Sequence, residues 1–453
     1  MTTDAMQSAE FDAWNPGLTS AIPIALLPYV SLYRPENSSV IYAQAKEITE
    51  FCGLDPVELV SFKTERLIVH ELLIRVSADL TVPDGPNYED LGICMRDMVD
   101  RILTEYVRPN LALVQAVHDQ IAVDAQSWID RDLTPLFVPA PPQATRQEKE
   151  SFFSRIFGKS GKASPAPHPS NEISPLEIIK TYSERRLNET DPFAQACLAA
   201  LTKVIGAVIS KWGRLINDPS LISKLAVRMV CNTYGSEKIG EAIEPFVQAA
   251  IVAENFHVLP AQEKPVIMNV KGASAAGKST IRSKQMLLSK KIGVPWNDFA
   301  VISPDYWRKY LLDYDSLGGD AKYAAMLTGQ ELEIVDKKLD RYMAAKAAKG
   351  NMTHLLIDRF RFDSFMLENE KAADTKLLTR FGDLVFMFFM ITAPEATVER
   401  AWQRGITTGR YKAVDDLIHH NIEAYTGMPK LFFSWALSKE KRIHYEFLDN
   451  NVR

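Results

Sequence analysis

Apolar side chains recur every three or four residues through the first 260 residues, which is the spacing of amphipathic helices. Between 56 and 78, for example, Leu59, Phe62 and Leu67 fall on one helical face. The spacing predicts helices over 40–51, 56–78, 88–129, 175–186, 192–216, 219–234 and 239–253. Glycine is scarce and strand-like alternation is nearly absent, so we predict an all-α region.

The pattern changes after Pro265, where short apolar runs alternate with helical segments. Strands are predicted at 266–270, 299–303, 353–357, 384–392 and 443–448, and helices at 281–288, 306–312, 330–349 and 394–404. The run 384–392 is apolar at nearly every position, as in a strand covered on both faces. The alternation predicts an α/β fold with a parallel sheet, covered by helices on both faces, whose ligands sit at the carboxyl ends of the strands.

Prolines, glycines and polar residues gather between residues 135 and 175. Such a stretch buries too little apolar surface to offset its ordering entropy, so it predicts a flexible linker. We therefore expect a helical region at 1–134, the linker at 135–175, a second helical region at 176–260 and the α/β domain at 261–453.

Composition narrows the class of protein. Apolar residues make up 46% of the chain and charged residues 24%, as in folded globular proteins, and a net charge of −5 gives no strong signal for nucleic acid. The four cysteines are scattered and form no C-x-x-C pair, which fits reduced thiols in the cytoplasm. No signal peptide is visible, and the longest apolar runs are too short for a membrane span.

A glycine-rich motif lies between the strand at 266–270 and the helix that begins at Ile281. It reads Gly272, Ala273, Ser274, Ala275, Ala276, Gly277, Lys278 and Ser279, and Thr280 follows. This is the G-x-x-x-x-G-K-[ST] pattern, whose backbone N–H groups bind a polyphosphate such as ATP. Lys278 would reach the β/γ-phosphates, and the Ser279 hydroxyl would bind Mg²⁺. The alternative is an ordinary glycine turn before a helix.

Two acidic residues follow predicted strands. Asp305, after the second strand, could accept the proton of an attacking hydroxyl, or it could cap the next helix. Asp358 ends the third strand, where it could hold Mg²⁺ or orient the acceptor, or pair with Arg359 or Arg361.

A basic segment, 399–412, joins a helix to a loop flanked by Gly405 and Gly409. Such a segment can close over a nucleotide and bring arginines to the transferring phosphate. We expect this role for Arg404 and Arg410, whereas Arg400 could equally belong to a solvated helix face.

The segment 265–453 resembles the zeta-toxin branch of the P-loop kinases in the glycine motif, in Asp305 and Asp358, in the basic segment and in the closing Phe447–Asn450. The resemblance implies a P-loop kinase domain with ATP and Mg²⁺ as cofactors. It implies that Asp305 is the catalytic base and that Lys278, Arg404 and Arg410 bind phosphate. The resemblance implies that the phosphoryl acceptor is a nucleotide sugar such as UDP-N-acetylglucosamine, or a nucleotide. It also implies that the protein acts as a toxin or effector. The family usually has Glu at the position of Asp358, so other small-molecule acceptors stay open.

Two other functions remain open at this point, an ATPase and a non-catalytic nucleotide-binding scaffold whose helical half binds a protein. A GTPase is excluded because no N-K-x-D motif is present. The helical region could bind a partner protein or inhibit the kinase domain from within the chain.

Overall fold

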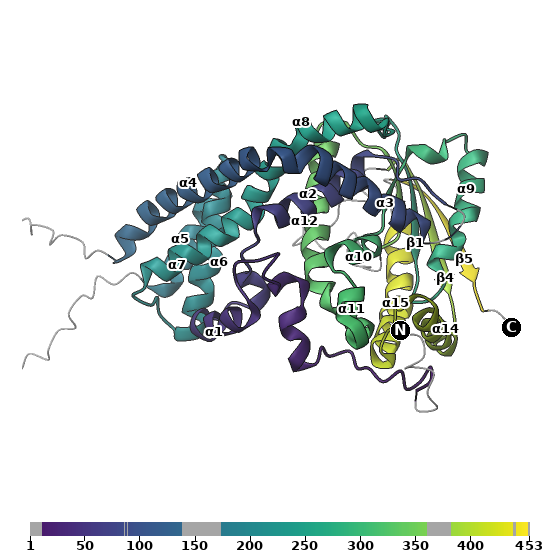
Figure 1. The fold of residues 1–453 in the computed structure, drawn as a ribbon, viewed down its shortest axis with the longest axis horizontal. Helices are drawn as coiled ribbons and strands as arrows, with labels where there is room; N and C mark the ends of the chain where they lie inside the picture. The colour runs from purple at the N-terminus through teal and green to yellow at the C-terminus, as the bar shows by residue number, and fades with distance from the viewer. Residues whose placement is uncertain are drawn as a thin grey trace, which may run out of the picture. The chain divides into compact units, whose positions relative to one another are not determined.

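The computed structural model describes residues 11–85, 87, 89–137, 174–359, 382–437 and 441–451. The chain forms two compact units (Figure 1). The first, here the α/β unit, comprises 1–44, 60–118 and 236–453, and the second, the helical unit, comprises 45–59 and 119–235. The predicted boundaries at 134 and 175 fall inside the helical unit, and the predicted boundary at 260 falls inside the α/β unit. Most of the predicted linker, 138–173, lies outside the described residues.

The α/β unit contains a five-stranded sheet in which every pairing is parallel, in the order β2-β3-β1-β4-β5. The strands are β1 (Val266–Lys271), β2 (Phe299–Ile302), β3 (His354–Ile357), β4 (Leu384–Ile391) and β5 (Arg442–Asp449). Each lies within one residue of its predicted bounds, so the α/β fold with a parallel sheet is confirmed. Every residue of β1 and β3 is buried, as expected for strands covered on both faces.

Helices make up the rest of the regular structure among the described residues. In the α/β unit they are α2 (Thr64–Asp79), α3 (Asp90–Arg101), α8 (Ser236–Glu254), α9 (Arg282–Lys291), α10 (Arg308–Leu311), α11 (Ala324–Leu327), α12 (Gly329–Ala348), α14 (Pro394–Thr408) and α15 (Val414–Ala436). In the helical unit they are α5 (Pro175–Asn188), α6 (Pro192–Trp212) and α7 (Pro219–Val230), and α1 (Tyr42–Cys52) and α4 (Leu111–Phe137) contribute to both units. Short 3-10 and π-helical turns connect several of them.

Helix α6 is the one helix among the described residues that is long and apolar enough to cross a membrane. Half of its apolar stretch is buried, as in a helix that packs within a protein core.

The strand order explains why ligands would gather beside β1. The chain passes from β1 to the far edge at β2, returns to β3, and then crosses β1 to reach β4. The order therefore reverses on either side of β1, and in parallel α/β sheets a crevice forms at the carboxyl ends of strands at such a point. The glycine motif begins at Gly272, directly after β1.

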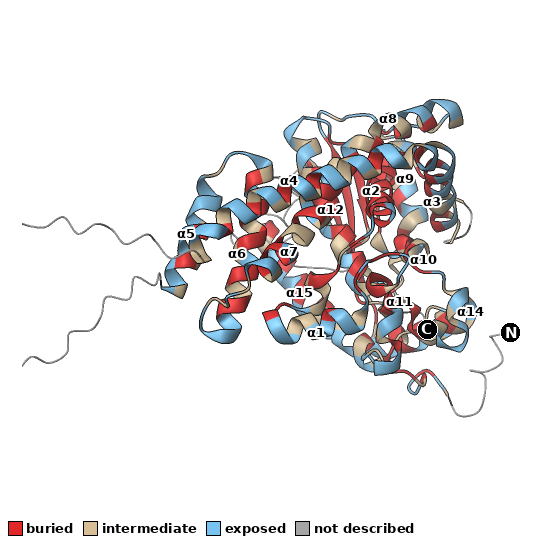
Figure 2. Ribbon diagram, turned by 60° about the vertical axis from the view of Figure 1, so that its left-hand side comes forward, coloured by how far each residue is buried: buried red, intermediate tan, exposed pale blue. Residues whose placement is uncertain are grey.

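Helix α2 is the most buried helix of the α/β unit, with 14 of its 16 residues buried (Figure 2). It packs against β2, α3, α8 and α12. Its apolar residues include Leu67, Ile68 and Leu72, each with no exposed surface. A helix from the N-terminal region is therefore part of the core that supports the sheet.

A buried polar network joins α2 to α12. Arg66 donates to both carboxylate oxygens of Glu331, at 2.6 and 2.8 Å, and His70 Nε2 lies 2.7 Å from the same carboxylate. On the other side of the ring, Lys338 Nζ lies 3.1 Å from His70 Nδ1 and donates to Ser236 Oγ at 2.7 Å. Burial, followed by the charge of Lys338, lowers the pKa of His70 to about 3, so the imidazole is neutral at pH 7.

A segment near the N-terminus, residues 11–20, packs against the last helices of the chain (purple in Figure 1). Ala13 lies in an apolar cluster with Val398 and Ala401 of α14 and Leu417 of α15. Ser20 Oγ donates to the Asp415 carboxylate. On its other side, Lys322 donates to the Gly17 carbonyl at 2.9 Å. We call residues 11–20 the N-terminal strap.

The buried pair of Arg66 and Glu331 gives a stability prediction. Arg66→Ala leaves the Glu331 carboxylate buried without its bidentate partner, so the free energy of unfolding should fall by about 3–5 kcal/mol. Arg34→Ala is the matched control, because its partner Glu36 is 57% exposed, and it should change stability by less than about 1 kcal/mol. Urea unfolding followed by circular dichroism measures both, and equal effects would contradict the role given to the network.

Candidate functional site

The glycine loop, residues 272–279, is held in place by the ends of neighbouring strands. The Ala276 carbonyl accepts hydrogen bonds from Thr392 Oγ1 at 3.0 Å and from Asn450 Nδ2 at 2.9 Å. Thr392 follows β4 and Asn450 follows β5, so these two strands fix the loop that follows β1.

The two glycines of the motif meet close neighbours. Gly277 has φ +90°, and a Cβ atom there would lie 2.2 Å from Asn450 Nδ2. A Cβ atom at Gly272 would lie 2.9 Å from Met390 Cβ. A larger residue at Gly272 would displace the end of β4, and one at Gly277 would displace the Asn450 side chain that holds the loop.

The residues after Gly277 enter a helical turn, Lys278–Ile281, which leads directly into α9. Ser279 and Thr280 thus lie at the start of a helix, where the Thr280 N–H donates to the Gly277 carbonyl at 3.0 Å. Lys278 Nζ donates to the Gly272 carbonyl at 3.3 Å and to that of Ala273 at 3.2 Å. The ammonium group therefore folds over the loop that the sequence assigns to phosphate.

Asp305 lies beyond β2 in the turn Pro304–Trp307. Arg308 Nε donates to its Oδ1 at 2.9 Å, and Arg410 Nη2 donates to its Oδ2 at 3.0 Å. Its side chain is 47% exposed, so a small molecule can reach the carboxylate. Desolvation opposes ionisation, but Arg410 and then Arg308 outweigh it and lower the pKa of Asp305 below its usual range.

Asp358 directly follows β3, and its N–H donates to the Ile302 carbonyl of β2 at 3.0 Å. Its Oδ1 is shielded from solvent and has no hydrogen-bond partner among the described residues. Desolvation raises the pKa of the Asp358 carboxyl against the charge of Lys278, and the charge of Asp305 acts with desolvation. Its Oδ1 is therefore open to a hydrogen-bond donor or a cation.

Arg359 pairs with helix α12 through Asp336 at 2.5 Å and Asp340 at 2.6 Å. Its side chain is only 2% exposed. It thus anchors the end of β3 to α12, which differs from the expected alternative of a pair with Asp358. Arg361 lies outside the described residues.

The basic segment differs from the prediction in one respect. Helix α14 continues past Arg404 to Thr408, so Gly405 lies within the helix rather than at the edge of a loop. A Cβ atom at Gly405 would lie 2.3 Å from the Tyr411 ring, so the missing side chain lets Tyr411 pack on the helix. Gly409, with φ +72°, ends α14 as a left-handed cap.

The arginines of this segment have different partners. Arg404 Nε donates to the Arg410 carbonyl at 3.3 Å and so supports the backbone that carries Arg410. Arg400 Nη2 donates to the Asn450 carbonyl at 2.6 Å, which gives Arg400 a structural contact at the end of β5.

These elements surround a cleft with two lobes, which share Lys278, Asp305, Arg308 and His420. The lid lobe, about 330 Å³, is further lined by Ser274, Ala325, Met326, Arg404, Arg410, Tyr411, Lys412, Ala413 and Asp416. The α12 lobe, about 400 Å³, is further lined by Pro304, Gly329, Leu332, Glu333, Asp336, Asp358, Arg359 and Glu423. The cleft brings together Lys278, Asp305, Asp358, Arg404 and Arg410, which the sequence had singled out at separate places.

Sequence reasoning missed Arg308 and His420 as lining residues, whereas Lys412 belongs to the basic segment that it singled out. Arg308 follows Asp305 by three residues, which is a helical spacing that could have been noticed. His420 lies on α15, a helix that was not predicted. Burial, followed by Lys412, lowers the pKa of His420 to about 4, so it is neutral at pH 7.

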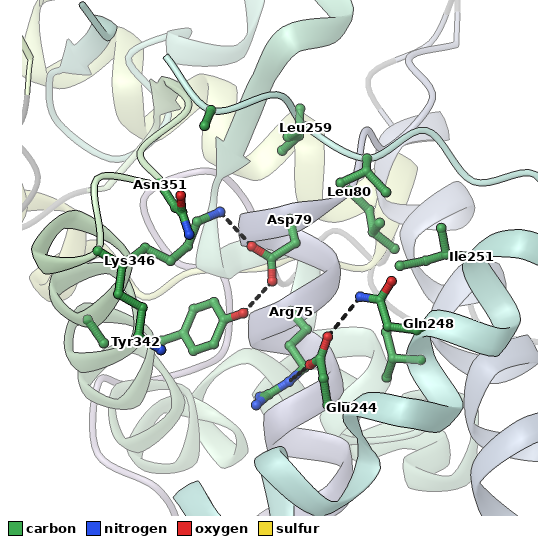
Figure 3. Close-up of a pocket in the computed structure, with 15 residues that line it drawn as sticks. Arg75, Asp79, Leu80, Glu244, Gln248, Ile251, Leu259, Tyr342, Lys346 and Asn351 are labelled. Atoms are coloured by element: carbon green, nitrogen blue, oxygen red, sulfur yellow. Dashed lines mark hydrogen bonds and ion pairs between the residues drawn. The ribbon is translucent and has the colours of Figure 1, made fainter. Parts of the chain in front are cut away.

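A separate cavity of about 350 Å³ lies near Ala261 and Asn351, before β1 and β3 begin (Figure 3). Six of its polar side chains pair with one another. Asp79 accepts from Tyr342 and Lys346, both at 2.5 Å, and Glu244 accepts from Arg75 and Gln248 (Figure 3). These pairs join α2, α8 and α12, and we interpret this cavity as a helix junction.

A scan against protein-family models and a search of curated proteins both find no match to this chain.

The packing of Gly405 can be tested by Gly405→Ala. In an unobstructed helix the change would stabilise the protein by up to about 1 kcal/mol, whereas contact with Tyr411 should destabilise it by about 1–3 kcal/mol. Thr407→Ala, at an exposed position of the same helix, is the control. Thermal unfolding gives the sign, and hydrogen exchange across 409–413 should rise only in Gly405→Ala. A stabilised Gly405→Ala protein would contradict the packing argument.

Proposed function

We propose that this protein is an ATP- and Mg²⁺-dependent phosphotransferase of the P-loop kinase type, which transfers the γ-phosphate of ATP to a hydroxyl group of a small molecule. The observation that carries the proposal is the convergence of Lys278, Asp305 and Arg410 on one cleft at the carboxyl end of β1. The resemblance of 265–453 to zeta-toxin kinases supports the same reaction.

The phosphates of ATP would lie on the glycine loop, residues 272–280. The loop supplies backbone N–H groups at a helix start, and Lys278 supplies a charge for the β- and γ-phosphates. The lid lobe adds Arg404, Arg410 and Lys412, and an arginine fork can bind two phosphate oxygens at once. The charge of this lobe suits a triphosphate.

The chain offers groups that fit Mg²⁺ beside the loop. No group of three acidic, histidine or cysteine side chains among the described residues is arranged to hold a metal ion by itself, and Mg²⁺ needs none because it is usually bound by one or two protein groups, water and phosphate oxygens. The unpartnered Oδ1 of Asp358 and the Ser279 hydroxyl would hold it. When bound, Mg²⁺ neutralises charge on the β- and γ-phosphates.

Asp305 would act as the catalytic base. The acceptor oxygen forms a bond to the γ-phosphorus, the bond to the β,γ-bridging oxygen breaks, and its electron pair leaves with ADP. The hydroxyl proton passes to the Asp305 carboxylate. Arg410 donates a hydrogen bond to one oxygen of that carboxylate. The γ-phosphate of ATP would compete with Asp305 for Arg410. When Arg410 moves to the phosphate, the Asp305 carboxylate loses a positive partner and becomes a stronger base.

Asp305→Asn and Lys278→Ala separate chemistry from binding. Asp305→Asn removes the proton acceptor but leaves Arg410 available to phosphate, so ATP affinity should be unchanged or higher and transfer should fall ~10²-fold or more. Lys278→Ala should instead lose most ATP affinity. Calorimetry measures the ATP affinity of each variant, and a γ-³²P transfer assay measures its rate of phosphoryl transfer. The proposal fails if folded Lys278→Ala binds ATP and turns it over as the unmodified protein does.

Arg410 should act mainly during transfer. Arg410→Ala should reduce the maximal rate by about 10²–10³-fold while the ATP dissociation constant changes much less. Arg410→Lys should restore only part of the rate, because an ammonium group cannot make the bidentate contact. Arg442→Ala, at an exposed position of β5, should leave both constants unchanged. A rate in Arg410→Ala equal to that of the unmodified protein would remove Arg410 from the mechanism.

A further inference from the structure

The two lobes of the cleft differ in charge. Among the described residues that line only the lid lobe, Arg404, Arg410 and Lys412 are cations and Asp416 is the one acid. The lid lobe is therefore the side on which a triphosphate is favoured.

The α12 lobe has the opposite charge. Of the described residues that line only this lobe, Glu333, Asp336, Asp358 and Glu423 are acids, and Arg359 is the one cation. The Arg359 guanidinium is already matched by two carboxylates, since Asp340 joins Asp336 on it. Its side chain is almost fully buried, which also keeps it from reaching a ligand.

The α12 lobe is a cavity rather than a flat surface. Its volume of about 400 Å³ lies within the range of small-molecule sites. Asp305, the proposed base, forms part of its wall, and so does the Asp358 carboxylate, whose shielded Oδ1 has no hydrogen-bond partner among the described residues. A molecule in this lobe would therefore present its hydroxyl groups to Asp305 and to several carboxylate acceptors.

We propose that the α12 lobe binds the phosphoryl acceptor, and that this acceptor is a polyhydroxylated molecule with no negative charge, either neutral or bearing a protonated amine. Hydroxyl and ammonium groups donate hydrogen bonds to carboxylates, whereas a phosphate or carboxylate group would meet like charges. The cations that also line the lobe have other partners, since Arg308 pairs with Asp305, Arg359 pairs with Asp336 and Asp340, and Lys278 is assigned to the phosphates of ATP. One acceptor hydroxyl gives its proton to Asp305 as its oxygen attacks the γ-phosphorus and ADP leaves. This inference rests on the proposed function and specifies its substrate class.

Ion-exchange separation of a metabolite extract tests the class of acceptor. The extract is divided into anionic, neutral and cationic pools, and each is incubated with the full-length protein, Mg²⁺ and γ-³²P-ATP. Label should be transferred with the neutral or cationic pool, at least tenfold above the anionic pool. Transfer that depends on the anionic pool would overturn this inference and leave the kinase proposal standing. If the protein binds ATP but no pool accepts label, the proposed function fails, and the inference fails with it.

A matched pair of variants locates the acceptor. Glu333 and Glu241 both lie on helix surfaces and pair with a lysine, Lys337 at 3.1 Å and Lys238 at 2.8 Å, but only Glu333 lines the cleft. With the active pool, Glu333→Lys should raise the acceptor KM about tenfold or more and change the KM for ATP less than twofold. Glu241→Lys should alter neither. An equal acceptor KM in both variants, with both proteins folded, would place the acceptor elsewhere.

Discussion

The parallel direction of all five strands is the constraint on which the cleft depends. Because the strands run the same way, their carboxyl ends meet along one edge of the sheet, and residues distant in sequence become neighbours. The Ala276 carbonyl shows the effect, since Thr392 after β4 and Asn450 after β5 both donate to it. The position of β1 in the middle of the sheet places the glycine loop between the ends of β3 and β4.

Helix α12 links this edge to the N-terminal helices. Glu331 faces α2 through Arg66 and His70, while Glu333 and Asp336 line the cleft. Within about two turns, α12 thus contributes side chains both to the buried core and to the wall of the cleft. A change in how α2 packs would reach the cleft through α12, so the N-terminal helices support the site although none of the described residues that line it comes from them.

The sequence predicted the strands because buried parallel strands are short apolar runs, and it predicted the glycine loop because its spacing is specific. It also singled out Asp305, Asp358 and Arg410, but their approach to one another depends on strand order, which local patterns do not contain. Gly405 was misread for a related reason, since a glycine needed for contact with Tyr411 looks the same in sequence as one that ends a helix. The ion pairs of Arg66 and Arg359 depend on tertiary packing alone.

The N-terminal strap has a consequence for the order in which the protein can assemble. Ser20 and its partner Asp415 are 395 residues apart in the sequence. The apolar partners of Ala13 likewise lie far along the sequence, in α14 and α15. At ribosomal rates of roughly 5–20 residues per second, the first of these residues emerges about 20–80 s before its partners exist. The contacts that join the strap to α14 and α15 can therefore form only after residues 398–417 have been made. A chain that stops before α14 would carry the glycine loop without Arg404, Arg410 and the rest of the lid lobe.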